Sequence, residues 1–93
     1  MKRGAVVSAQ QLGFTGAEIL QYRLLDTSPA VGIALKELRF PRDAVIGAVI
    51  KGRGVETPGG QTVLKPGDEV LVFALPSGLA EIDKFFTVER RKS

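Results

Sequence analysis

The stretch VLKPGDEVLVF, residues 63–73, joins a polar turn to a strand that is apolar on both faces. Pro66 fixes φ at about −65°, and Gly67 can adopt the positive φ that the next position of a type II turn requires. Side chains alternate between the two faces of a strand, and from Val70 to Leu75 neither face receives a polar one. Both faces of this strand must therefore be covered by the rest of the chain or by another molecule.

The remaining segments predict two helices and several further strands. The segment 26–38 predicts a helix with Ser28 as its N-cap and Pro29 at its first position, and 76–86 predicts a second helix with Ser77 as its N-cap. The apolar stripe of the second helix comprises Leu79, Ile82, Phe85 and Phe86. Strands are expected over 4–12, 17–25, 44–51 and 55–58. Apolar and polar side chains alternate in 17–25, whereas 44–51 is apolar on both faces. The Val6-Val7 pair of the first strand suits a parallel sheet.

This order predicts an α+β domain, with a small, largely antiparallel sheet and two helices in the sequence strand-helix-strand-strand-strand-helix. Two short helices can cover one face of such a sheet. The other face is then exposed, or it is covered by a second copy of the domain in a homodimer. The alternative is a sheet twisted strongly enough to wrap its own core.

Composition and charge exclude several classes of function. The 93 residues contain no cysteine and no histidine, which removes thiolate chemistry, the commonest zinc ligands and the usual general base near neutral pH. The net charge of +3 comes from the ends, because residues 4–88 hold eight basic and nine acidic side chains. A nucleic-acid-binding module carries its positive charge on a folded face, so this distribution argues against nucleic acid as a partner. No apolar run reaches the ~18 residues of a membrane span, which argues against direct membrane insertion.

Short motifs give no support to catalysis. The Gly59-Gly60-Gln61 tripeptide, which peptide-chain release factors also use, and the glycines of 52–54 fit ordinary turns, and neither has the spacing of a phosphate-binding loop. Adjacent Asp68 and Glu69 diverge to opposite faces of a strand and cannot work as a paired acid and base. The sequence therefore predicts that the chain is not an enzyme and that it holds no metal and no cofactor.

The stretch from Ala17 to Phe73 resembles the TrkA C-terminal domain family, also called RCK-C. The resemblance rests on Ser28-Pro29 with Gly32, on VIGAVIKG at 45–52, and on Pro58, Thr62, Leu64 and Gly67-Asp68 in the family's order and spacing. It implies a TrkA-C domain over 17–88, preceded by residues 1–16 as the trailing segment of a nucleotide-binding half or a linker, and followed by a disordered basic tail at 89–93. Such a domain resembles the C-terminal end of a Trk potassium-uptake regulatory subunit.

The resemblance implies a cytoplasmic, dimerising, ligand-sensing regulatory domain that gates a potassium or cation transporter or channel. The domain would reach the inner membrane only through that membrane-embedded partner. Some members bind cyclic di-AMP at the dimer interface, and these carry a polar, amide-bearing residue near the start of the strand that matches 44–51. Val45 or a neighbour stands at that place, which argues against cyclic di-AMP. The alternative is a stand-alone small-molecule-sensing or protein-interaction module that is not linked to ion transport.

Basic residues near the predicted interface strand are the candidate ligand-binding groups. Arg39, Arg42 and Lys51 can hold the phosphate or carboxylate of an anionic nucleotide effector at the dimer interface. Ile46 and Ala48 of the same strand complete the predicted site. The competing interpretation is that these charges are ordinary solvated surface.

Overall fold

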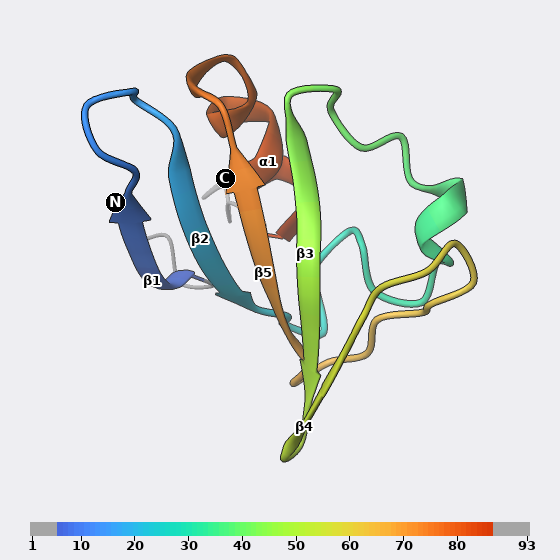
Figure 1. Ribbon diagram of the computed structural model, residues 1–93. Coiled ribbons are helices and arrows are strands. Elements are labelled where there is room, and N and C mark those ends of the chain that lie inside the picture. The colour runs from blue at the N-terminus through green and yellow to red at the C-terminus, as the bar shows by residue number, and fades with distance from the viewer. Residues whose placement is uncertain (1–5, 87–93) are drawn as a thin grey trace, which may run out of the picture.

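Five antiparallel strands form one sheet in the computed structural model, which describes residues 6–86 (Figure 1). The sheet order is β1-β2-β5-β3-β4. The strands are β1 (Val6–Gln11), β2 (Glu18–Arg23), β3 (Ala44–Lys51), β4 (Gly54–Glu56) and β5 (Glu69–Ala74), with 3-10 turns η1 (Leu35–Glu37) and η2 (Pro76–Gly78) and the helix α1 (Leu79–Phe86). The predicted α+β class and antiparallel sheet are confirmed, and β5 lies at the centre of the sheet.

The turn before β5 has the predicted geometry. Gly67 adopts φ +91°, and the Asp68 N–H donates to the Lys65 carbonyl at 3.0 Å, which closes the turn. The Gly67 N–H donates to the carbonyl of Leu24 at 2.8 Å. This turn therefore fixes the start of β5 against the end of β2, its neighbour in the sheet.

One face of the sheet carries the core. Leu20 and Tyr22 of β2, and Val70 and Val72 of β5, are completely buried there beneath α1, which lies behind the sheet in Figure 1. The rings of Tyr22 and Phe86 pack with their centroids 4.9 Å apart. The predicted helix stripe is confirmed: Ile82 and Phe86 are buried, and Leu79 and Phe85 pack against the same cluster.

The opposite face of the sheet, which we call the outer face, is uncovered in the described chain. On β5 the buried residues alternate with Leu71 and Phe73, which point outward, and Phe73 is 39% exposed. Val45, which pairs with Phe73 across β3 and β5, is 55% exposed, and Leu75 is 51% exposed. The two apolar faces of β5 therefore have different surroundings, one in the core and one in solvent, as the helix count predicted.

The predicted helix over 26–38 is wrong. The segment is a chain of turns with a single 3-10 turn at Leu35–Glu37, and Gly32 adopts φ +85°, which an α-helix does not accommodate. The N–H groups of Gly32, Leu35 and Lys36 donate to the carbonyls of Leu64, Thr62 and Gly60, each at 2.9 Å. Pairing with 60–64 satisfies the backbone that a helix would have satisfied internally, so the domain has one α-helix and not two.

Neither serine predicted as an N-cap caps a helix start. The Ser28 hydroxyl is buried; it accepts the Leu25 N–H at 3.0 Å and donates to the Phe86 carbonyl at 2.9 Å. Ser28 thus supplies a hydrogen-bond donor at the C-terminal end of α1, where carbonyls lack donors within the helix. Ser77 lies within η2, and its hydroxyl donates to the Asp43 carboxylate at 2.6 Å.

The strand prediction at the N-terminal side needs one correction. Val6–Gln11 is indeed a strand, but it pairs antiparallel with β2 at the edge of the sheet and is not part of a parallel sheet. The predicted strand over 55–58 is observed as β4, which begins one residue earlier and ends at Glu56. The predicted tail at 89–93, and the last two residues of the predicted domain, lie outside the described residues.

Candidate functional site

An apolar groove lies beside η1, between that turn, β3 and the glycine turn at 58–60. We call it the η1 groove, and its volume is about 390 Å³. Its lining comprises Leu35, Lys36, Leu38, Phe40, Ala44, Val45, Ile46, Pro58, Gly59 and Gly60. Lys36 is exposed and supplies the one cation of this lining. A methyl group on Gly60 would lie 3.4 Å from the Lys36 Cβ, so the glycine allows the two segments to approach closely.

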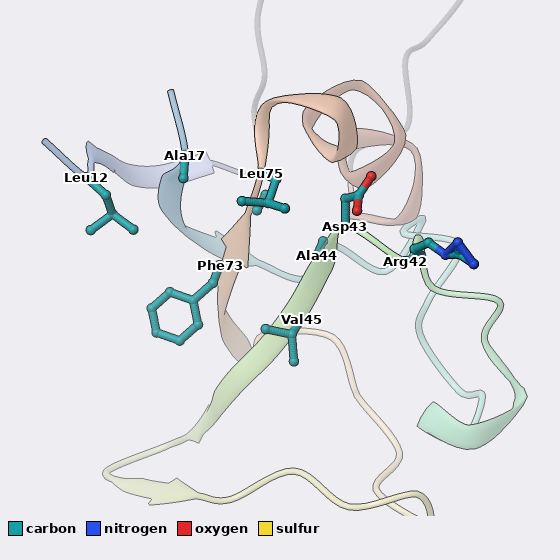
Figure 2. A pocket seen from close by; sticks show the side chains of 9 residues that line it. Leu12, Ala17, Arg42, Asp43, Ala44, Val45, Phe73 and Leu75 are labelled. Carbon is teal, nitrogen blue, oxygen red and sulfur yellow. The ribbon is translucent and has the colours of Figure 1, made fainter. Parts of the chain in front are cut away.

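A second hollow, the outer depression, opens on the uncovered face (Figure 2). Its volume is about 300 Å³. Its lining comprises Leu12, Ala17, Arg42, Asp43, Ala44, Val45, Phe73, Ala74 and Leu75. Figure 2 shows the side chains of Leu12, Phe73 and Val45 around this hollow, whereas the Arg42 guanidinium points away from Phe73. The depression is therefore chemically apolar, with charge only at its rim.

A bulge in β3 separates two of the predicted site residues. The pairing register between β3 and β5 shifts between Ile46 and Ala48, with Gly47 at the irregularity. Ile46 pairs with buried Val72 and lines the η1 groove, whereas Ala48 pairs with Leu71 on the outer face. A methyl group at Gly47 would lie 2.6 Å from Cε2 of Phe73, so the glycine allows that ring to lie across the bulge.

Of the three predicted basic residues, Lys51 lies far from the other two. Arg39 and Arg42 are exposed, and in the described part of the chain no hydrogen bond or ion pair engages either guanidinium. Lys51 stands at the far end of β3, seven residues from Ala44, which is roughly 23 Å of strand. Its ammonium group is already paired with the Asp68 carboxylate. The five predicted residues therefore do not form one cluster within a single chain.

Polar side chains occupy one end of the outer face. Gln21 and Arg23 of β2 both donate to the Glu69 carboxylate, and the Arg23 Nη2 lies 2.9 Å from Glu69 Oε2. The hydrogen bond from Gln21, followed by that from Arg23, holds the pKa of Glu69 below its usual value. Glu69 is therefore a stable carboxylate on the outer face and is poorly suited to act as a general acid.

The comparisons with known proteins agree with this architecture. The family model described as the TrkA-C domain matches residues 19–87. The chain belongs to the TrkA-C domain family. Among curated relatives, the Trk system potassium uptake protein TrkA homolog 1 of Methanosarcina mazei is 34% identical over 70 residues, which cover 75% of this chain and 16% of the relative. The Trk system potassium uptake protein TrkA of Azorhizobium caulinodans is 31% identical over 88 residues, which cover 95% of this chain and 19% of the relative.

This TrkA-C domain also resembles a solved RCK domain. That structure, described as an RCK domain with cda, matches with a TM-score of 0.62 and 20% identity, and the match covers 73% of this chain and 96% of the other. At this identity the likeness shows a shared fold. The chain spans less than a fifth of the length of either TrkA relative described above.

The sequence did not reveal the η1 groove. Leu35 and Leu38 fall in the segment predicted as a helix, Pro58 falls in the predicted strand over 55–58, and Gly59 falls in the turn that follows it. The structure brings them together because 26–40 pairs with 60–64. Within residues 6–86, no group of three acidic side chains could hold a metal ion, and no helix there is long and apolar enough to cross a membrane.

Proposed function

We propose that this TrkA-C domain is a dimerising, non-catalytic regulatory domain of a potassium uptake system, and that it acts from the cytoplasm on a membrane-embedded transporter. The family match and the names of the TrkA relatives support the link to potassium transport. The uncovered outer face of the sheet supports the dimer and carries the proposal. An apolar patch of this kind on a soluble domain marks an interaction site.

The outer face fits a dimer interface in composition. Val45, Phe73 and Leu75 expose between 39% and 55% of their surfaces on it, although all three are apolar. The polar group of Gln21, Arg23 and Glu69 lies at one end, as a rim does around an apolar interface centre. A second copy that packs on this face would bury the apolar centre and leave the polar group in contact with water.

A dimer offers a simple route to regulation. A ligand shifts an equilibrium between two arrangements only if it binds one of them more tightly. A coupling free energy of about 1–3 kcal/mol is sufficient for allosteric control. We expect an anionic nucleotide as the effector, because Lys36 lines the η1 groove and Arg39, which is exposed, follows the groove residue Leu38 in the chain, so that both can hold phosphate.

The regulatory role is tested in the cell. Deletion of the segment encoding residues 17–88 from the chromosomal gene should change potassium or rubidium uptake, or abolish its response to external potassium. The matched control carries Ile33→Ala in the same gene, at an exposed apolar position outside both hollows. Unchanged flux and unchanged regulation in the deletion strain would contradict the proposal.

The effector is tested on the purified chain. A thermal-shift screen of nucleotides should reveal one that raises the melting temperature of the wild-type chain, and Lys36→Ala and Arg39→Ala should each reduce that shift. Lys65→Ala is the matched control, because Lys65 is exposed and lies outside both hollows. A nucleotide that binds both variants as tightly as the wild type does not use this groove.

A further inference from the structure

Phe14 projects from the turn that joins β1 to β2. Its side chain is fully exposed, at 107% of the reference surface, so among residues 6–86 it packs against no other side chain. The turn beneath it is well bonded: the Thr15 hydroxyl donates to the Leu12 carbonyl at 2.8 Å, the Ala17 N–H donates to the Thr15 hydroxyl at 3.0 Å, and the Leu12 N–H donates to the Ala17 carbonyl at 3.0 Å. A phenyl ring is thus held in water on an ordered support.

The outer depression provides an apolar receptacle of suitable size. A cavity of about 150 Å³ lined by aliphatic and aromatic side chains is large enough to bind benzene. The outer depression has about twice this volume and is lined by Val45, Phe73 and Leu75. It can therefore accept a phenyl ring, and the ring of its own chain does not fill it, since Phe14 is fully exposed.

We propose that a second copy of this chain closes the depression, with Phe14 of each copy seated beside Val45 and Phe73 of the other. This inference rests on the dimer proposed above and assigns its central contact. Leu12 belongs to the lining of the depression and stands two residues before Phe14, so the projecting ring and the receptacle form one small patch. Because one patch holds both the ring and its receptacle, the same patch on two copies can pack together about a two-fold axis. Each copy then inserts its ring into the depression of the other.

The exposed ring of Phe14 alone supplies about a quarter of the surface that a standard dimer interface buries on each partner. A standard interface buries roughly 800 Å² on each partner, which is a modest share of the 5931 Å² surface of this chain. An aromatic side chain such as Phe14 contributes about 200 Å². The exposed apolar surfaces of Val45, Phe73 and Leu75 surround the receptacle and extend the contact. A peptide from a different protein could fill the depression but would leave Phe14 in water, whereas a second copy covers both.

The oligomeric state tests this contact. Light scattering and sedimentation across micromolar to millimolar concentrations should show that Phe14→Ala raises the dimer dissociation constant by about tenfold or more, as expected for an aromatic anchor. Ile33→Ala, which truncates an exposed apolar side chain away from the outer face, should leave the constant within about twofold of wild type. The melting temperature of the Phe14 variant at low concentration should match that of wild type, because the removed ring is fully exposed in the single chain.

Disulfide cross-linking locates the ring. The chain has no cysteine, so a Phe14→Cys chain mixed with a Val45→Cys chain can form a mixed disulfide only between two copies. Mild oxidation should give this product in preference to the product from Phe14→Cys mixed with Ile33→Cys. If the wild type dimerises but Phe14→Ala dimerises equally well and no preferential cross-link forms, the inference fails while the regulatory dimer stands. A wild-type chain that stays monomeric at millimolar concentration overturns both the contact and the proposed dimer, whereas the flux experiment tests the link to potassium uptake independently.

Discussion

Replacing Ser28 with alanine should destabilise the domain by about 2 kcal/mol. Ser28 is 5% exposed, and its hydroxyl links two segments that lie far apart in sequence, because it accepts the Leu25 N–H and donates to the Phe86 carbonyl. Each hydrogen bond contributes about 1 kcal/mol net, and a buried group left without a partner costs about 1–3 kcal/mol. The carbonyl of Phe86 is at the end of α1 and has no donor within the helix to replace the lost hydroxyl.

Urea unfolding followed by circular dichroism measures this loss. Ser28→Ala should lower the unfolding midpoint without changing the m-value, because the unfolded surface stays the same. In a domain of this size 1 kcal/mol corresponds to about 4–8 °C, so the melting temperature should fall by about 8–16 °C. The matched control is Ser77→Ala, which also removes a serine hydroxyl that donates to a protein oxygen, but at an exposed position. Its cost should be within about 0.5 kcal/mol.

Two outcomes would refute this reasoning. If Ser28→Ala unfolds at the same urea concentration as wild type, the hydroxyl does not hold the end of α1. If Ser77→Ala costs as much as Ser28→Ala, burial of the hydroxyl is not what determines the loss.

Three further substitutions test other parts of the structure. Gly32→Ala should lower the free energy of unfolding by about 1 kcal/mol, because Gly32 has φ +85°, which strains alanine even with open space around it. The same change inside a helix would raise that free energy by about 1 kcal/mol. The sign of the change in the urea midpoint therefore distinguishes a turn from a helix. Asp68→Ala should cost about 2 kcal/mol, because the carboxylate is paired with the ammonium of Lys51 and is mostly buried, and a midpoint equal to wild type would show that this pair is not formed. The hydrogen bond from Gln21 lowers the pKa of Glu69 in the folded state, so its stabilising effect is complete above the unfolded pKa of about 4.3 and is lost as the pH falls through the folded value. The difference in stability between wild type and Glu69→Gln should accordingly be constant from pH 8 to about 5 and shrink at lower pH, and a difference independent of pH down to about 2 would contradict the assignment.

Local patterns in the sequence determine much of the sheet and its helix. Alternation buries Leu20 and Tyr22 on one face of β2, and the spacing of Ile82 and Phe86 gives α1 its buried stripe. Pro66 and Gly67 suffice for the turn before β5, because φ is restricted at one residue and free at the next. These features follow from interactions between residues a few positions apart, which is why they can be predicted without knowledge of the whole fold.

The uncovered outer face was predicted by a different kind of reasoning. The sequence contains more two-faced apolar strand than two helices can cover, and this follows from counting elements. The prediction holds with one helix instead of two, because the segment 26–40 packs over the same inner face through Val31, Leu35 and Leu38. The count could not identify Phe14 as the most exposed aromatic residue, since a phenylalanine in a turn carries no pattern that shows which way it points.

Tertiary contacts alone determine the conformation of the segment 26–38 and the set of residues that line the candidate site. Ser28 and Pro29 satisfy the local rules for a helix start, yet the backbone donors of Gly32 and Leu35 find acceptors some thirty residues away, and the hydroxyl of Ser28 finds one 58 residues away. Propensity is worth less than 1 kcal/mol per residue and gives way to such long-range pairing. The bulge at Gly47 then places Ile46 and Ala48 on opposite faces of the sheet, although residues two apart in a regular strand share one face.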